Sequence, residues 1–356
     1  IILNLQLRIC IRRISFMNVL LTGGCGYIGS HILIDLIINR HKVIVIDNLC
    51  NSDKDNLKAI EDMTNTKIKF YEIDLRNKEK LDHIFSENKI DVVIHLAGLK
   101  NNPESIKLPL RYYESNVSGS INLFSAMLNH KVFKIIFSSS ATVYKETEYM
   151  PLNENSAIEP KAPYGNSKRT IEQILESMVF TNSKWKVIVL RYFNPAGAHS
   201  SGLISESHRF MVSNLMNQIL YTADNKKKFL NVYGDDYNTE DGTGVRDYVH
   251  VSDLSKAHIL AFNKLMSEDF NEKFITVNIG SGKGYSVKEM IKTFEKINNI
   301  EVKFKIQPRR NGDIAKSYTS ISFAKSFLNW EPNETLNTIC KDSWNSYKKN
   351  SNLKIS

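Results

Sequence analysis

The sequence predicts a doubly wound α/β fold, in which helices cover both faces of a parallel sheet, with a smaller C-terminal lobe. Short runs rich in Val and Ile recur through the first half of the chain without polar alternation. This pattern is typical of strands that are covered on both faces. Helical patterns separate these runs, and such alternation favours a parallel sheet. At 356 residues the chain is long enough for two lobes.

The elements of the first lobe follow in order along the chain. Asn18–Thr22 is a short apolar run that predicts the first strand, and the pattern over Tyr27–Asn39 predicts a helix directly after it. Further strands are expected at Lys42–Asp47, Lys67–Ile73, Asp91–Ala97, Phe133–Ser138 and Lys186–Leu190.

The alternation ends after Asn194, and the second lobe is expected from there. Loops follow, with a helix around Val212–Tyr221. The runs Tyr248–Val251 and Thr276–Ile279 are predicted to be strands that pack back on the first lobe. We therefore place the lobes at residues 17–194 and 195–350.

The composition narrows the class of function. The net charge is +9, but the basic residues are scattered and form no patch interleaved with aromatic residues, so no nucleic-acid partner is expected. No apolar run reaches the length of a membrane span. The four cysteines have neither C-x-x-C nor metal-ligand spacing, so no metal is expected and a reducing compartment, the cytoplasm, is favoured.

Residues 1–16 precede the first methionine, Met17. They are apolar and carry Arg8, Arg12 and Arg13 after the apolar stretch. That order is the reverse of a signal peptide, and no small-residue cleavage site follows. We interpret this stretch as an extension that is disordered or foreign to the native chain.

A glycine turn lies between the first strand and the first helix. Gly23, Gly26 and Gly29 are spaced G-x-x-G-x-x-G, which lets a backbone approach a pyrophosphate at a helix N-terminus. Asp47 ends the second strand, where a carboxylate accepts from two ribose hydroxyls and repels a 2′-phosphate. Asp74 closes the third strand and suits an adenine amino group, although a plain surface turn would also explain it. These features predict a Rossmann-like domain that binds NAD rather than NADP.

A second motif carries acid–base chemistry. Tyr164 and Lys168 form Tyr-x-x-x-Lys, which on a helix places both side chains on one face. A lysine ammonium and a cationic nicotinamide would stabilise the tyrosine phenolate, so that Tyr164 becomes a general base. The spacing alone also fits a solvated helix face. It gains force from Ser140, which lies in a serine-rich strand end where chemistry collects in parallel sheets.

At these motifs the chain resembles the UDP-glucose/UDP-galactose 4-epimerase family of the extended short-chain dehydrogenase/reductases. The resemblance runs from Met17 to about Tyr347. The motifs that carry it are T-G-G-C-G-Y-I-G-S-H, D-N-L-C-N-S, H-L-A-G-L-K, F-S-S-S-A-T-V-Y, P-Y-G-N-S-K, L-R-Y-F-N-P-A-G-A-H and G-T-G-V-R-D-Y-V-H-V.

The resemblance implies an isomerase with bound NAD, which interconverts UDP-galactose and UDP-glucose through a transient 4-keto intermediate. Its catalytic residues are Tyr164, Lys168 and Ser140. The cofactor residues that it implies are Gly23, Gly26, Tyr27, Ile28, Gly29, Asp47, Asn48, Leu49, Cys50, Asn51, Ser52, Asp74, Leu75, Leu96, Ala97, Gly98, Lys100, Asn116, Ser140, Tyr164, Lys168 and Phe193. The UDP-sugar residues that it implies are Ser140, Tyr164, Asn194, Asn214, Leu215, Asn231, Arg246, Arg310, Asp313 and Ser317.

Two further expectations rest on the resemblance. The helix near Tyr164 and the stretch Pro109–Asn129 match the pair of helices that joins family homodimers. The residue four after Asp313 is Ser317, and a small residue there implies that the pocket also admits UDP-GalNAc and UDP-GlcNAc. The neighbouring Tyr318 is the alternative, since a shift of one residue would place its ring in the pocket instead.

The chain departs from the family pattern at three places. Pro103 and Lys145 replace glycines, and the segment before the substrate helix reads Phe210-Met-Val-Ser-Asn214 in place of G-I-P-N-N. The last change affects the loop that is expected to hold the nucleotide.

Four other functions stay open at this point. A dehydratase or decarboxylase of the same fold carries an acid before Val-Tyr, whereas Ser140-Ala141-Thr142 has no ionisable side chain. A non-catalytic NAD-binding protein need not keep Tyr164, Lys168 and Ser140 together. A dehydrogenase that releases NADH, and a 4-epimerase of UDP-pentoses or uronic acids, are the other two. His31, His95, His199 and His250 are read as packed residues without a catalytic role.

Overall fold

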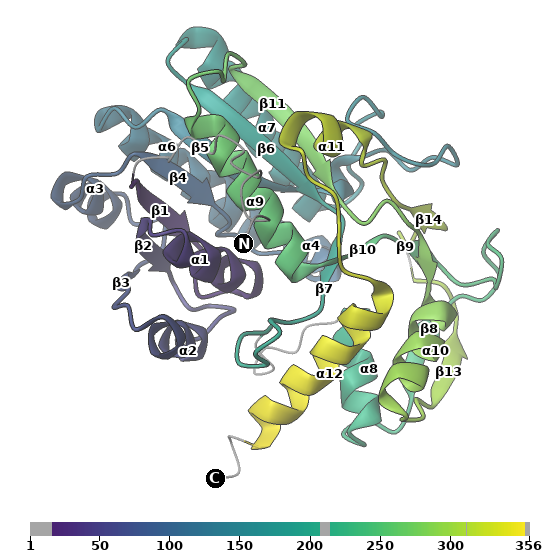
Figure 1. Cartoon of the computed structure of the whole chain (residues 1–356). Coiled ribbons are helices and arrows are strands. Elements are labelled where there is room, and N and C mark those ends of the chain that lie inside the picture. The colour runs from purple at the N-terminus through teal and green to yellow at the C-terminus, as the bar shows by residue number, and fades with distance from the viewer. Residues whose placement is uncertain (1–15, 207–213, 311, 353–356) are drawn as a thin grey trace, which may run out of the picture.

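The computed structural model describes residues 16–206, 214–310 and 312–352. A seven-stranded parallel sheet forms its centre, in the order β11-β6-β5-β4-β1-β2-β3 (Figure 1). The strands are β1 (Asn18–Thr22), β2 (Lys42–Asp47), β3 (Lys69–Glu72), β4 (Val92–His95), β5 (Lys134–Ser140), β6 (Lys186–Tyr192) and β11 (Phe274–Ile279). The predicted doubly wound α/β class is confirmed.

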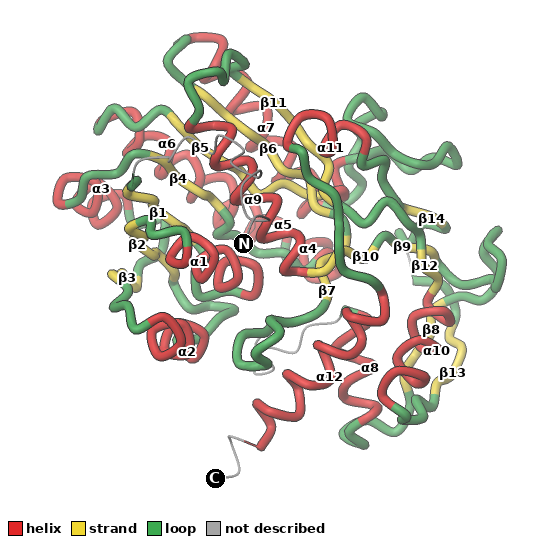
Figure 2. Tube along the Cα trace, in the orientation of Figure 1, coloured by secondary structure: helices red, strands yellow, loops and turns green. Residues whose placement is uncertain are grey.

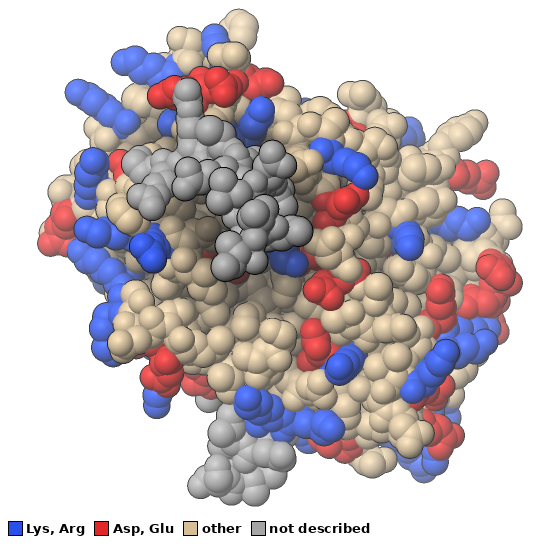
Figure 3. Space-filling view, in the orientation of Figure 1, with Lys and Arg blue, Asp and Glu red and all other residues tan. Residues whose placement is uncertain are grey.

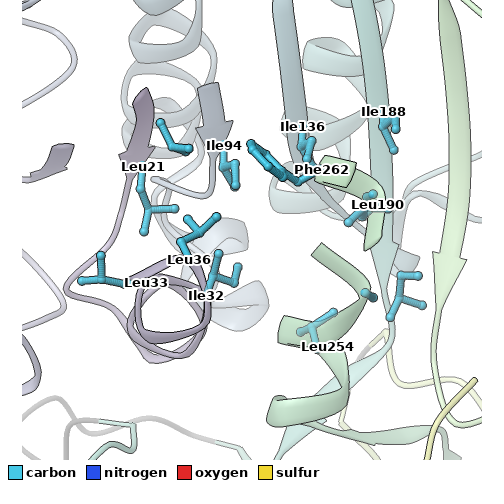
Figure 4. Packing of buried hydrophobic residues seen from close by; sticks show 14 of the residues in the cluster. Leu21, Ile32, Leu33, Leu36, Ile94, Ile136, Ile188, Leu190, Leu254 and Phe262 are labelled. Carbon is cyan, nitrogen blue, oxygen red and sulfur yellow. The ribbon is translucent and has the colours of Figure 1, made fainter. Parts of the chain in front are cut away.

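Helices cover both faces of this sheet. One face packs against α1 (Tyr27–Ile38), α2 (Asp55–Thr64), α9 (Val251–Met266) and α11 (Ser322–Leu328). The other packs against α3 (Lys78–Glu87), α6 (Gly119–Asn129) and α7 (Pro163–Thr181). Successive strand residues point to opposite faces, so Leu21 joins the first core and Leu20 the second. Figure 4 shows the first core, where Leu36 of α1 and Phe262 of α9 meet residues of the strands.

The predicted elements agree with the observed ones, with shifts at their ends. The bounds of β1 and β2 are as expected, and β3 and β4 are shorter. Strands β5 and β6 run further than expected, because Ser139 pairs with Arg191 and Ser140 with Tyr192. The run predicted at Thr276–Ile279 is the end of β11, which pairs with β6 at the edge of the sheet.

The stretch Pro109–Asn129 consists of three helical segments. These are α5 (Pro109–Tyr112), a π-helical turn η1 (Tyr113–Ser118) and α6. Before them lies α4 (Asn102–Lys107), and a short 3-10 turn, η2 (Ala141–Val143), follows β5. A π-turn inside a helix often marks a functional position, and Asn116 lies within this one.

A second lobe follows the sheet, below and to the right in Figure 2. Its core combines α8 (Leu215–Ala223), α10 (Val287–Asn298) and α12 (Leu336–Asn352) with the parallel pair β8 (Leu230–Tyr233) and β13 (Phe304–Gln307). The expected helix begins at Leu215, and residues 212 and 213 of its predicted range lie outside the described residues.

Short strands lie between the two lobes. The strand predicted at Tyr248–Val251 is β10 (Tyr248–His250), and it pairs with β7 (Asn194–Ala196). A second small sheet joins β12 (Tyr285–Ser286), β9 (Val245–Arg246) and β14 (Lys316–Ser317). These strands bring residues from both lobes to the carboxyl ends of the central sheet.

The surface carries both signs of charge. Lys and Arg side chains are interspersed with Asp and Glu over the face in Figure 3. Within the described residues, no helix combines the length and the apolar composition that crossing a membrane requires. The predicted extension of residues 1–16 lies outside the described residues except for Phe16, which is exposed.

Candidate active site

A large cleft of about 1290 Å³ opens at the carboxyl ends of the central strands and extends to the second lobe. A pocket for one drug-sized ligand has roughly 300–1,000 Å³, so this cleft has room for two ligands. All of the predicted site residues line it except Leu49 and Asn116. The fold thus gathers residues that the sequence spreads from Gly23 to Ser317.

The glycine turn is packed too tightly for side chains. A Cβ on Gly29 would lie 2.1 Å from the carbonyl oxygen of Gly23, and Gly23 itself has φ +74. No acidic residue lies in the first turn of α1, and no side chain caps its N-terminus at Gly26. The first N–H groups of α1 therefore face the cleft beside Tyr27 and Ile28, which is the arrangement that binds a diphosphate. These features fit the pyrophosphate of NAD.

Asp47 lies at the end of β2, as predicted, and is buried. Its carboxylate accepts hydrogen bonds from the Leu49 N–H (2.9 Å), the Ser52 hydroxyl (2.8 Å) and the Cys25 N–H (3.1 Å). Burial raises the pKa of Asp47, and these bonds oppose the rise. Leu49 has φ +56 and packs against the core beneath the cleft. Leu49, which was predicted to be a cofactor residue, does not line the cleft.

Asp74 frames the far end of the cleft with Leu75, Asn48 and Cys50. The Arg76 guanidinium donates two hydrogen bonds of 2.9 Å to its carboxylate, and Asn48 donates a third of 2.8 Å. These bonds, led by that of Arg76, lower the pKa of Asp74 to about 2. The carboxylate is thus ionised and can accept from an amino group.

The loop after β4 forms the floor of the cleft. Leu96, Ala97 and Gly98 line it, and the buried Asn116 holds the loop from below. Its side-chain oxygen accepts from the Leu99 N–H at 2.8 Å, and its amide donates to the Leu99 carbonyl at 3.0 Å and the Ser167 hydroxyl at 3.1 Å. Asn116 therefore holds the loop after β4 against α7, and does not itself line the cleft.

Lys100 continues the same loop toward the second lobe. Its ammonium forms an ion pair of 2.6 Å with Glu206 and lies 5.7 Å from the centre of the Tyr27 ring. The resemblance placed Lys100 near the cofactor phosphates, and here a carboxylate holds the ammonium at the same end of the cleft.

Ser140, Tyr164 and Lys168 line the same cleft. Ser140 ends β5, and its hydroxyl accepts from the Thr142 hydroxyl at 2.9 Å. Tyr164 and Lys168 lie in the first two turns of α7. The Lys168 ammonium donates to the Ser138 carbonyl at 2.8 Å, so the lysine is fixed against the strand that carries Ser140.

The protonation of the pair is set mainly by burial. Burial lowers the pKa of Lys168 to about 8, and the Glu172 carboxylate opposes this. Burial raises the pKa of Tyr164 above 10.0, while the Ser140 hydroxyl favours the phenolate. Burial is the larger effect, so the net change in the Tyr164 pKa is upward in this structure. The expectation of a stabilised phenolate rests on two positive charges, the Lys168 ammonium and a cationic nicotinamide.

The second lobe contributes cationic and polar groups. Arg310 is held by Asp313 at 2.8 Å and lies over the Tyr233 ring at 4.7 Å. Arg246 and Asn231 line the same part of the cleft. Two guanidinium groups in one place suit a diphosphate, whose oxygens a guanidinium binds in a bidentate way.

The remaining predicted residues lie between these groups. Phe193 is buried in a small apolar cluster with Tyr144, and Asn194 begins β7 at the mouth of the cleft. Asn214 caps α8 by accepting from the Asn217 N–H at 2.8 Å, and Leu215 follows it. Phe193 stays a predicted cofactor contact, and Asn194, Asn214 and Leu215 stay predicted contacts of the sugar nucleotide.

Ser317 lines the cleft and Tyr318 does not. Ser317 pairs with Arg246 across β14 and β9, while the Tyr318 ring packs near Gly284. The alternative in which Tyr318 fills the pocket is therefore not what the structure shows.

The departures from the family pattern leave this centre intact. Pro103 lies in the first turn of α4, where proline is well tolerated. Lys145 forms a surface ion pair of 2.6 Å with Glu159. Of the changed segment, only Asn214 lies within the described residues.

The histidines have structural partners. His95 lies between the hydroxyls of Thr22 (2.7 Å) and Ser120 (2.8 Å), and burial lowers its pKa to about 3. His31 contacts the Tyr27 carbonyl at 2.8 Å, and His250 caps α9. His199 contacts the Ser201 hydroxyl at 2.8 Å.

Sequence reasoning missed three charged residues at or behind the cleft. Glu206 binds Lys100 and also accepts from the side chains of Asn214 (2.7 Å) and Asn217 (2.8 Å). Glu172 and Arg191 form a buried ion pair of 2.8 Å behind Lys168. Glu172 is four residues after Lys168, a spacing that could have placed it on the catalytic face of the helix.

Comparison with known proteins agrees with this geometry. A profile of the GDP-mannose 4,6 dehydratase family matches residues 20–343. The UDP-glucose 4-epimerase of Bacillus subtilis (strain 168) is 44% identical over 328 residues, which cover 92% of this chain and 96% of the relative.

Two solved structures are similar over nearly their whole length. The UDP-glucose-4-epimerase from Stenotrophomonas maltophila, with bound NAD and formylated UDP-arabinopyranose, has a TM-score of 0.91 and 42% identity, covering 95% of this chain and 99% of that one. The UDP-glucose 4-epimerase from Bifidobacterium longum, in complex with NAD+ and UDP, has a TM-score of 0.89 and 41% identity, covering 94% and 99%.

Proposed function

Because the chain belongs to the GDP-mannose 4,6 dehydratase family and, within it, to the UDP-glucose 4-epimerases, we propose that it interconverts UDP-glucose and UDP-galactose. One observation carries the proposal. Ser140, Tyr164 and Lys168 line the same cleft as a tight glycine turn at one end and Arg246 and Arg310 at the other. This arrangement suits a sugar held between a dinucleotide and a diphosphate clamp.

Each catalytic residue has a distinct task. Tyr164 takes the proton from the C4 hydroxyl and returns a proton to the C4 oxygen. Ser140 hydrogen-bonds that oxygen, and Lys168 supports the phenolate. When bound, oxidised NAD supplies a reversible hydride acceptor and a positive charge that favours the phenolate, so no net oxidant is consumed. The 4-keto sugar turns over in the cleft between the two halves of the reaction.

The residues of the cleft fit the alternative functions less well. Dehydration needs an additional acid beside the sugar, whereas Ala141 is apolar and the Thr142 hydroxyl is directed to Ser140. A passive NAD-binding protein has no need of a buried lysine behind a tyrosine. A dehydrogenase that releases NADH, and an epimerase of UDP-pentoses or uronic acids, are outcomes that product analysis separates from ours.

The test is incubation with UDP-galactose and product analysis by NMR. UDP-glucose should form without added oxidant and without release of NADH. Tyr164→Phe should lose most of the activity, roughly 10²–10⁴-fold as for other general bases, and keep NAD binding. Near-normal turnover in that variant would remove Tyr164 from the mechanism.

We propose that the two lobes bind different ligands. Residues 17–194 bind NAD, and residues 195–350 bind the UDP-sugar, apart from the segments in α9, α11 and β11 that complete the central sheet. The support is that the glycine turn, Asp47 and Asp74 lie in the first part, and Arg246 and Arg310 in the second.

A wider substrate range follows from Ser317. A serine leaves room for an acetamido group at C2 of the sugar and can hydrogen-bond it. The enzyme should therefore turn over UDP-GalNAc as well as UDP-galactose, and Ser317→Tyr should lose only the N-acetylated substrate. Equal losses for both substrates would show that Ser317 does not face C2.

We also propose a cytoplasmic homodimer. The segment α5–α6 and helix α7 expose large apolar side chains, among them Leu110 at 74% and Phe180 at 91%, and a partner that covers them would form a four-helix interface. The described cysteines, Cys25, Cys50 and Cys340, are free thiols, which suits a reducing compartment. Light scattering at micromolar concentration should give twice the chain mass, and a monomer mass would reject the dimer.

A further inference from the structure

The buried face of α7 carries a third charged residue beyond the catalytic pair. Tyr164, Lys168 and Glu172 follow at intervals of four residues, which places them on one side of the helix. Glu172 is fully buried, although a lone carboxylate is among the least favourable groups to bury. It does not line the cleft and has no part in the reaction described above.

Glu172 connects α7 to two strands of the sheet. The Arg191 guanidinium of β6 donates to both carboxylate oxygens, at 3.0 and 2.8 Å. The Ser139 hydroxyl of β5 donates to it at 2.5 Å, and Arg169 on the helix surface at 3.1 Å. Ser139 precedes the catalytic Ser140, so these bonds join the helix of Tyr164 to the strand of Ser140.

Arg191 is in turn held on its other side. It donates to the Tyr144 hydroxyl at 3.0 Å and lies 4.9 Å from the centre of that ring. Tyr144 donates to the Asn278 side chain at 2.6 Å. Contacts with Glu172 on one side and Tyr144 on the other therefore hold the guanidinium.

A buried ion pair of this kind is weak evidence for a role in stability. Removing two charges from water costs about as much as their attraction returns, and apolar pairs of equal size are often as stable. The pair therefore calls for another explanation, and its position one turn from Lys168 offers one.

Lys168 needs a nearby negative charge. It is 4% exposed, and burial favours its neutral form. Its other close contacts are neutral, namely the Ser138 carbonyl and the face of the Phe137 ring at 5.0 Å. His95 of β4 faces it as well, but is itself neutral because its pKa is about 3. Among the described residues, Glu172 is the carboxylate that favours the ammonium form.

The other ionisable groups near Glu172, Arg191 and Lys168 interact with further side chains. On the side of Arg191 these are Tyr144 and Glu154, on the helix surface Arg169 and Glu176, and beside Tyr164 the phenol of Tyr192, which contacts His258.

We propose that Glu172 is a positioning residue that keeps Lys168 in its charged form, with Arg191 as the buried counter-ion that keeps Glu172 ionised. The pH profile of kcat tests this inference only if the proposed function is correct, whereas the modification of Lys168 tests it independently. Loss of the carboxylate makes Lys168 lose its proton at lower pH, after which it no longer supports the Tyr164 phenolate.

The test compares pH profiles of kcat for four proteins. Glu172→Gln should move the alkaline limb to lower pH by about one unit, the lower end of the shifts that one nearby opposite charge produces. Glu172→Asp keeps the charge and should keep the limb in place. Glu176→Gln is the matched control, because Glu176 is a half-exposed partner of Arg169 on the same helix. A purely structural Glu172 would lower kcat or thermal stability in both Glu172 variants without moving the limb.

A second readout does not require catalysis. The rate at which acetic anhydride modifies Lys168, measured by peptide mass spectrometry against pH, gives its pKa directly. The same downward shift is expected in Glu172→Gln. If the unchanged protein has no epimerase activity, the proposed function fails while this measurement still decides the role of Glu172.

A double variant covers the case in which Glu172→Gln does not fold. Glu172→Gln with Arg191→Met leaves no unpaired buried charge, so the fold should hold. It should also show the downward shift. An unchanged alkaline limb and an unchanged Lys168 modification profile in a folded variant would overturn the proposal.

Discussion

The tightest contact in the proposed cofactor turn gives a prediction with a definite size. In Gly29→Ala the new methyl carbon would lie 2.1 Å from the Gly23 carbonyl oxygen and 2.8 Å from Cα of Gly24, where ordinary contact starts at 3.4 Å. The turn and α1 must separate by about 1 Å or more. Overpacking costs about 1–3 kcal/mol, and the upper end applies because the opposing atoms are backbone. If this strain is present in the conformation of the turn that binds NADH, a cost of about 3 kcal/mol lowers the affinity for NADH about a hundredfold.

Gly26→Ala is the informative comparison. A Cβ there meets only the Gly23 carbonyl oxygen, at 3.2 Å, and the backbone of Gly26 is extended with φ −71. Its cofactor-free form should melt close to the unchanged protein, while Gly29→Ala should melt several degrees lower. NADH binding is measured by nucleotide fluorescence and melting by calorimetry. If Gly29→Ala binds NADH as tightly as the unchanged protein and melts at the same temperature, the close packing of this turn does not serve the cofactor.

Three further predictions concern single side chains. Asp47→Ala should narrow the preference for NADH over NADPH in fluorescence titrations, because the carboxylate repels a 2′-phosphate; equal binding of both by the unchanged protein would contradict the ribose assignment. Lys100→Met should weaken NADH binding and also lower the melting temperature of the cofactor-free protein, because the largely buried Glu206 loses its ion-pair partner; unaltered binding would show that Lys100 serves Glu206 alone. The pKa of Glu206 is lowered below 4.5, because Lys100 and the amides of Asn214 and Asn217 outweigh burial, which alone would raise it. Its contribution to stability is therefore present above pH 4.5 and lost as the pH falls through the folded-state pKa, so Glu206→Gln should flatten the acid side of the stability profile in urea unfolding.

The sheet was largely predictable because its strands are apolar on both faces. The bounds of β1 and β2 were right to the residue, since Val, Leu and Ile fill them and Gly23 and Asn48 follow. The end of β5 was missed by two residues. The predicted strand ends at Ser138, and Ser139 and Ser140 stay in the observed strand because β6 pairs with them and Glu172 accepts a hydrogen bond from the Ser139 hydroxyl. That partner comes from a helix 33 residues away, which no local pattern reveals.

The site was predictable where a motif constrains the backbone. It was less predictable where side chains pair with residues that are distant in the sequence. The glycine turn was predictable because its close backbone packing leaves no room for side chains at Gly23 and Gly29. The motif D-N-L-C-N-S does not show which of its side chains line the cleft. Leu49 has a left-handed backbone conformation, and its side chain packs against the core instead. Glu206, the ion-pair partner of Lys100, lies 106 residues later in the chain, and no pattern in the sequence connects the two.

The buried pair of Glu172 and Arg191 could have been inferred from topology. Arg191 stands in a strand whose other residues are nearly all apolar and covered, so its charge needs a partner inside the protein. Strands β5 and β6 are adjacent and parallel, and the chain between them passes through α7. A right-handed crossover packs that helix against the same two strands, so the carboxylate for Arg191 is to be sought on the inner face of α7. That face contains Tyr164, Lys168 and Glu172, so the carboxylate that pairs with Arg191 lies one helical turn from Lys168.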